Sequence, residues 1–150
     1  MLSTFAIRAI LAIWIVGFTA TSASAREENI IGSWSFETDR YRADTCVLYG
    51  SMQVRPTAEE DIYRCTFTAV EDCDGQDRWV VEQTCRASRD GDNLAIQSTI
   101  VNFLEFEQHT ENYAPDHFAL AVESANKMVG TLVSAIRAKV TFERTPDTIS

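Results

Sequence analysis

The stretch IRAKVTFE, residues 136–143, carries the clearest structural pattern in this 150-residue chain. Apolar and polar residues alternate strictly along it, so every second side chain belongs to the same face of an extended strand. A strand with this pattern packs one face against a core and exposes the other to water. The stretch therefore predicts a half-buried β-strand near the end of the chain.

The same two-residue period recurs through the chain back to residue 31. No segment carries a convincing apolar stripe of helical length, although the composition of 119–129 would also suit a helix. We prefer two strands there because Glu123–Asn126 has the sequence of a hairpin turn. Asp74-Gly75 and Asp90-Gly91 are further hairpin signals, since glycine tolerates positive φ. The pattern predicts a single all-β domain with eight antiparallel strands near 31–38, 44–55, 61–72, 78–88, 93–104, 116–123, 127–134 and 137–144.

The first 25 residues have the form of a secretory signal peptide rather than of a strand. Arg8 precedes an apolar run from Ala9 to Phe18, and Ala23-Ser24-Ala25 has the small-x-small form of a cleavage site. A retained membrane anchor is the alternative, but the apolar run is shorter than the roughly 20 residues of a membrane span. We therefore expect a periplasmic or secreted domain over residues 26–150, with no membrane contact after cleavage.

The charge balance argues against several kinds of partner. The chain has 13 Lys and Arg against 22 Asp and Glu, which gives a net charge of −9. Cleavage of the signal peptide would also remove Arg8, and the mature chain would be more acidic still. An acidic protein of this size repels nucleic acid and anionic lipid surfaces. The 45% hydrophobic content also excludes a disordered acidic tail. We expect no nucleic-acid partner.

All four cysteines lie after the leader, at positions 46, 65, 73 and 85. An even number of cysteines after a signal peptide indicates two disulfides, and the absence of a C-x2-C pair disfavours the alternative zinc site. Counting outward from the hairpin turns places Cys65 opposite about residue 86, one position from Cys85, and Cys46 opposite about residue 71, close to Cys73. We therefore predict the disulfides Cys65–Cys85 and Cys46–Cys73.

Eight antiparallel strands can form either a sandwich or a closed barrel. Gly32-Ser33-Trp34 opens the first strand and Arg144 ends the last. This arrangement resembles the lipocalin-like, or calycin, pattern. The resemblance implies an eight-stranded up-and-down barrel in which Trp34 closes one end and the Arg144 side chain stacks on its ring. It is closest to the small periplasmic lipocalin-like barrels, which include secreted protease inhibitors.

No catalytic motif is present, so we expect a protein that is not an enzyme and has no cofactor. The alternative is an enzyme that uses His109 with Glu107 or Asp116. The only histidines are His109 and His117, and there is no G-x-S-x-G sequence. Two acidic groups could in principle bind a metal, but we interpret them as a solvated strand end and a hairpin turn, and predict no metal site. The first of these groups contains Glu105, Glu107 and His109 with Asp116 and His117. The second group contains Asp72, Asp74 and Asp77.

The strand aromatics are either core or a binding site, because a small barrel can be filled by side chains or hold one ligand. The candidate ligand-binding residues are Tyr63, Phe67, Trp79 and Phe118, and the loop Tyr113–Phe118 is a further candidate. We expect a non-enzymatic binding protein for a small apolar ligand or for an envelope or secreted protein. The alternative is an inhibitor of a secreted protease, although only Arg26–Ile30 precede the first strand, too few to insert into a target.

Overall fold

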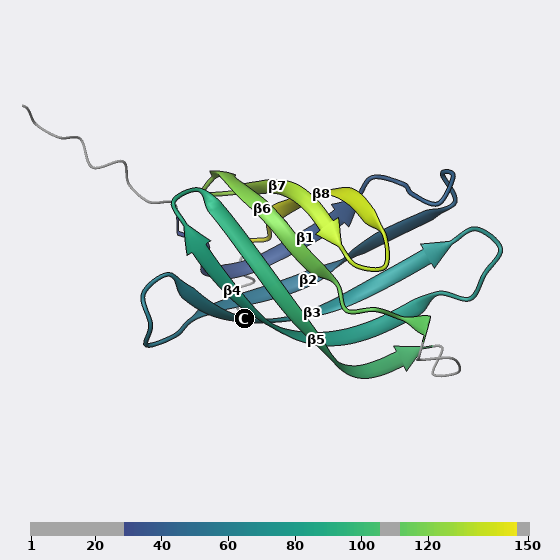
Figure 1. Cartoon of the computed structure of the whole chain (residues 1–150), viewed down its shortest axis with the longest axis horizontal. Helices are drawn as coiled ribbons and strands as arrows, with labels where there is room; N and C mark the ends of the chain where they lie inside the picture. The colour runs from purple at the N-terminus through teal and green to yellow at the C-terminus, as the bar shows by residue number, and fades with distance from the viewer. Residues whose placement is uncertain (1–28, 106–111, 147–150) are drawn as a thin grey trace, which may run out of the picture.

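The computed structural model describes residues 29–105 and 112–146. Eight antiparallel strands form a closed barrel in which each strand pairs with the next and β1 pairs with β8 (Figure 1). The predicted all-β barrel is confirmed, while the predicted leader and the residues Glu107 and His109 lie outside the described residues. The strands are β1 (Gly32–Thr38), β2 (Cys46–Pro56), β3 (Ile62–Cys73), β4 (Trp79–Asp90), β5 (Asn93–Glu105), β6 (His117–Ser124), β7 (Lys127–Val133) and β8 (Arg137–Arg144).

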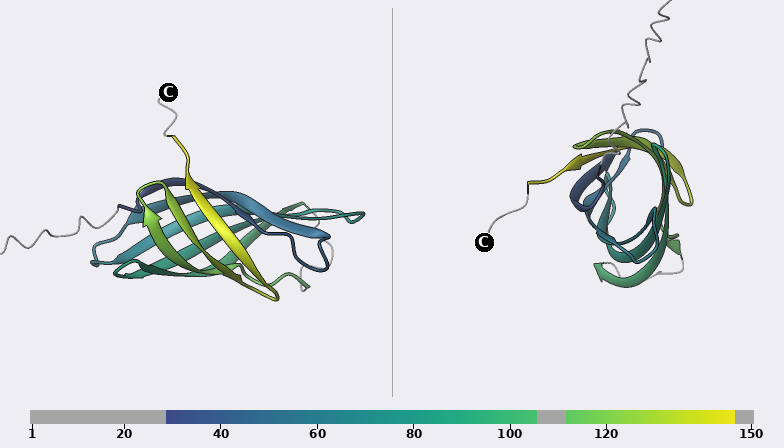
Figure 2. Two further views of the ribbon diagram at one scale, coloured as in Figure 1. Left: turned by 90° about the horizontal axis from the view of Figure 1, so that it is seen from above. Right: turned by 90° about the vertical axis from the view of Figure 1, so that its left-hand side faces the viewer.

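The connections alternate between the two ends of the barrel (Figure 2). Gly75 lies in the β3–β4 turn and Gly91 in the β4–β5 turn, with φ of 71° and 57°. Both are in the positive-φ region that glycine tolerates, as the two hairpin signals predicted. The β2–β3, β4–β5 and β6–β7 turns lie at one end, which we call the closed end. The β1–β2, β3–β4 and β7–β8 connections lie at the other end, together with the end of β5 and the start of β6, and we call it the open end.

A cluster of four phenylalanines fills the middle of the barrel. The rings of Phe36 and Phe142 stack with centroids 5.1 Å apart, and Phe118 packs edge-on against both, at 5.5 and 5.2 Å. Phe67 completes the cluster, 5.9 Å from Phe36. A Cβ built at Gly50 would lie 2.7 Å from the Phe36 ring, so the small residue makes room for a core aromatic side chain.

The closed end is sealed by a single buried tryptophan. Trp34 is fully buried and donates its indole N–H to the carbonyl of Ile30, at 2.9 Å. Arg144 is its cross-strand partner, and the guanidinium carbon lies 4.4 Å from the ring centroid. A Cβ built at Gly32 would lie 2.7 Å from that guanidinium, so the glycine lets Arg144 approach the backbone. A cation over an indole face is attracted by the ring quadrupole.

Two disulfides join neighbouring strands, and they are the pairs that the hairpin register predicts. Cys46 and Cys73 are directly opposite in β2 and β3, and Cys65 and Cys85 are directly opposite in β3 and β4. The first bridge lies toward the open end and the second toward the closed end. No helix in the described ranges is both long and apolar enough to cross a membrane.

Candidate binding surface

The structure separates the predicted ligand-binding residues into two groups. Phe67 and Phe118 lie together in the phenylalanine cluster, with centroids 5.8 Å apart, and Tyr63 is half-buried against the same core. Trp79 belongs to a second aromatic group at the open end, where it packs against Phe103 and Tyr113 at 5.8 and 5.6 Å. The four residues therefore do not surround one shared space.

A buried hydrogen-bond network occupies the open end. The Asp116 carboxylate accepts bonds from the side-chain amide of Gln83, at 2.6 Å, and from the Tyr113 hydroxyl, at 2.7 Å. The Gln83 carbonyl in turn accepts the backbone N–H of Asp116. Burial raises the pKa of Asp116 to about 6, while the bonds from Tyr113 and Gln83 act in the opposite direction. The network fixes the segment before β6 to the barrel wall.

A second carboxylate lies in the same end of the barrel. The buried Glu71 accepts a bond from the Tyr41 hydroxyl at 2.8 Å and lies 3.4 Å from the guanidinium of Arg42. Burial raises the pKa of the Tyr41 hydroxyl, and the neighbouring Glu71 carboxylate raises it further. Both carboxylates are thus held by neighbouring side chains, so a buried polar cluster occupies the open end.

Several of the residues considered as metal ligands contact other side chains or the backbone instead. Asp74 pairs with Arg40 at 2.9 Å, and the exposed Glu105 pairs with Arg78 at 2.7 Å. His117 uses Nδ1 to accept the backbone N–H of Ser98, at 2.9 Å. Within residues 29–105 and 112–146, no three His, Cys, Asp or Glu side chains lie close enough together to hold a metal ion.

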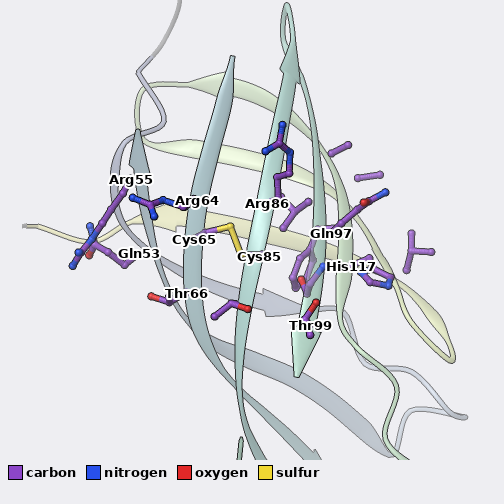
Figure 3. Close-up of a pocket in the computed structure, with 17 residues that line it drawn as sticks. Gln53, Arg55, Arg64, Cys65, Thr66, Cys85, Arg86, Gln97, Thr99 and His117 are labelled. Carbon is purple, nitrogen blue, oxygen red and sulfur yellow. Dashed lines mark hydrogen bonds between the residues drawn. A yellow bond between two sulfur atoms is a disulfide. The ribbon is translucent and has the colours of Figure 1, made fainter. Parts of the chain in front are cut away.

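A concavity with a volume of about 1260 Å³ lies mainly on the outer wall of β2 to β6 (Figure 3). We call it the outer groove. Most of its lining residues belong to the solvent-facing set of each strand. Three are arginines, and none is an aspartate, a glutamate or a lysine. The lining residues are Gln53, Arg55, Arg64, Cys65, Thr66, Thr84, Cys85, Arg86, Ala95, Ile96, Gln97, Ser98, Thr99, His117, Phe118, Ala119 and Val133.

The three arginines form a row across neighbouring strands. Arg55 of β2 is directly opposite Arg64 of β3, and Arg64 is directly opposite Arg86 of β4. All three side chains are exposed, and Figure 3 shows them along one side of the Cys65–Cys85 disulfide. Arg86 contacts the carboxylate of Glu59 at 3.1 Å, whereas Arg55 and Arg64 have no carboxylate partner among the described residues.

Uncharged hydrogen-bonding groups continue the groove beside this row. Thr66, Thr84 and Thr99 are successive cross-strand partners on β3, β4 and β5. Ser98, which also lines the groove, is buried, and its hydroxyl has no hydrogen-bond partner in the part of the chain that the structure describes. The groove therefore offers cationic and neutral donors without a competing carboxylate in its lining.

Sequence reasoning missed the arginine row, although the necessary signal was present. The hairpin register that pairs Cys65 with Cys85 also places Arg64 opposite Arg86, one residue away on each strand. The register that pairs Cys46 with Cys73 likewise places Arg55 opposite Arg64. Applying the register to charged residues as well as cysteines would have revealed three facing arginines.

Comparisons with known proteins support the fold alone. No protein-family model matches the chain, and no curated protein matches it. Among solved structures, the chain is similar to a de novo designed fluorescence-activating β-barrel, with a TM-score of 0.55 and 14% identity over 79% of this chain and 96% of that one. It is similar to a redesigned β-barrel at a TM-score of 0.55 and 12% identity, over 77% of this chain and 91% of that one.

Proposed function

We propose that this chain is a non-enzymatic binding protein of an oxidising, extracytoplasmic compartment, and that it binds an envelope or secreted protein through its outer surface. One observation carries the proposal: the phenylalanine cluster fills the middle of the barrel, with each ring within 6 Å of its neighbours. Four rings in contact with one another occupy interior space that a cargo would need. Binding is then assigned to the outer wall, where the outer groove lies.

The two disulfides support the compartment. They form readily outside the cytoplasm and are rare within it, and the predicted leader is consistent with export. The predicted absence of catalysis stays part of this proposal. A secreted protease is one member of the proposed class of partner.

The second candidate is a small apolar ligand at the open end. Trp79, Phe103 and Tyr113 are half-buried there and form an aromatic group that a flat apolar molecule could join. The solved barrel described as fluorescence-activating has the same fold, which makes a small ligand worth testing in this chain too.

Native mass spectrometry separates the two candidates. If the protein acts through its surface, the exported protein should have the mass of the chain alone and should release no adduct on denaturation. That mass should be four hydrogens below the value for the reduced chain, because two disulfides have formed. Release of a stoichiometric adduct of a few hundred daltons would contradict the proposal and identify a cargo. The Phe118→Ala variant supplies the positive control, because the cavity left by the ring should take up benzene where the unmodified core excludes it.

A further inference from the structure

We propose that the row Arg55, Arg64 and Arg86 is the contact site for a cluster of carboxylates on the partner protein. The inference rests on the proposed function, that the chain acts through its outer surface, and adds the chemistry that the partner must present. It assigns the outer groove as the recognition surface (Figure 3).

The arrangement of the charges is unfavourable without a bound anion. Neighbouring strands lie about 4.8 Å apart, so the backbone positions of the three arginines span roughly 10 Å across the sheet. Like charges directly opposite each other destabilise a sheet, and here Arg64 faces an arginine on both sides. Among the described residues, no aspartate or glutamate lines the groove. Folding alone therefore gives no reason for the row, whereas binding an anion does.

Glu59 shows which ligand suits the row. Its carboxylate already contacts the outermost member, Arg86, at 3.1 Å, and both side chains are more than half exposed. Arg55 and Arg64 lack such a partner among the described residues. An arginine presents a planar fork that bonds both oxygens of a carboxylate. Carboxylates of a partner protein would contact Arg55 and Arg64 as Glu59 contacts Arg86.

The composition of the groove favours a protein over other anionic partners. The cores of protein interfaces are enriched in arginine and depleted in lysine, glutamate and aspartate, and the groove lining contains arginines and none of the other three. The net charge of −9 repels extended polyanions and anionic membranes at long range, but a local patch still attracts a local acidic cluster.

A titration with a defined acidic peptide tests the assignment. The ¹⁵N-labelled protein would receive hexaglutamate at low salt while its amide chemical shifts are recorded. We expect saturable shifts on the outer positions of β2, β3 and β4, and weaker binding as salt screens the charges. The R55Q/R64Q variant should bind about tenfold more weakly, since it loses two charge-assisted contacts. The R55K/R64K variant, which keeps the charges but lacks the fork, should lie between the two.

The matched control removes two arginines that already form ion pairs within the chain. The R40Q/R78Q variant has the same net charge as R55Q/R64Q, but Arg40 and Arg78 are already paired with Asp74 and Glu105. Hexaglutamate should bind it within about twofold of the unmodified protein. Equal losses in both variants would reduce the effect to general charge attraction and overturn the proposal. Unfolding curves for each variant verify that a loss of binding is not a loss of fold.

Two further titrations distinguish a protein partner from other anions. A heparin oligosaccharide or vesicles with an anionic lipid should bind more weakly than the peptide, and tighter binding at the same positions would overturn the assignment to a protein. The proposed function, binding through the outer surface, has a separate test: a cargo released in the mass spectrum would contradict it. Failure of the peptide to bind a barrel without cargo would overturn only the arginine assignment.

Discussion

The two ends of the barrel are closed by different chemistry. At the closed end a fully buried Trp34 fills the opening, and the positive charge of Arg144 lies on its ring at the protein surface. At the open end the charged groups are themselves buried, with Asp116 held by Gln83 and Tyr113. The first closure rests on apolar burial, so we expect its contribution to stability not to change with pH. The second depends on the protonation state of a carboxylate.

The backbone shows the same contrast. Among the described residues, three of the four non-glycine residues with positive φ lie in one loop at the open end: Arg42, Ala43 and Asp44, at 50°, 56° and 69°. The Arg40 side chain holds this loop by donating to the carbonyl of Asp44 at 2.7 Å. Each such residue costs of the order of 1 kcal/mol or more. Strain and buried charge thus coincide at the end opposite the apolar seal.

The largest expected effect comes from breaking the apolar seal. Trp34→Ala should lower the free energy of unfolding by about 4 kcal/mol, because it removes a completely buried indole and leaves a cavity. Trp79→Ala is the matched control at the open end, where the ring is only half-buried, and should cost about 2 kcal/mol. Urea unfolding of both variants measures the difference, and equal costs would show that the two ends contribute alike.

A pH series tests the polar closure. Burial raises the pKa of Asp116 to about 6, above its value of 3.8 in an unfolded chain, so between these values the folded state binds more protons. Stability should therefore fall as pH rises from about 4 to 6, by about 3 kcal/mol at 1.36 kcal/mol per unit, and level off above pH 7. The groups facing Asp116 are Tyr113, Gln83, Ser134 and the second carboxylate, Glu71, which also raises the pKa.

Asp116→Asn isolates this contribution. The amide oxygen still accepts the bonds from Gln83 and Tyr113, but the side chain no longer ionises. The free energy of unfolding of the variant, relative to that of the unmodified protein, should increase as pH rises. Urea unfolding of both proteins at pH 4.5 and 7.5 measures this difference. Parallel pH dependence in the two proteins would show that Asp116 does not titrate in this range.

The sequence predicted the closed end much better than the open end, for a physical reason. Alternation predicts which side chains point inward, and counting from the hairpin turns predicted both disulfides, although Cys46–Cys73 lies toward the open end. The pairing of Trp34 with Arg144 was predicted from the resemblance to lipocalin-like barrels, and the two residues are cross-strand partners. The bond between Gln83 and Asp116 joins residues 33 positions apart across the barrel. Asp116 follows the longest connection of the chain, whose path no periodicity determines.

A conservative change at the closed end should have a smaller effect. The Arg144 guanidinium donates to the carbonyls of Ala125, at 2.6 Å, of Ile31, at 2.7 Å, and of Asn29. Arg144→Lys keeps a cation near Trp34 but cannot reach all three carbonyls, so it should cost about 1.5 kcal/mol. The cost should be the same at pH 4.5 and 7.5 by urea unfolding. A cost that changes with pH would contradict the contrast between the ends.

The smallest expected effect has the opposite sign and concerns the wall between the ends. Arg64→Thr removes the central arginine and with it both like-charge contacts, and it introduces a good strand former beside Thr66. The free energy of unfolding should rise by about 0.5 kcal/mol at low salt, and the gain should shrink as salt screens the repulsion. Arg78→Thr, which breaks a pair with Glu105 instead, should leave stability unchanged or slightly lower. A gain confined to Arg64 means that the row persists at a cost to stability, as expected of residues retained for binding rather than for folding. A loss at Arg64 would mean that the arginines support the sheet.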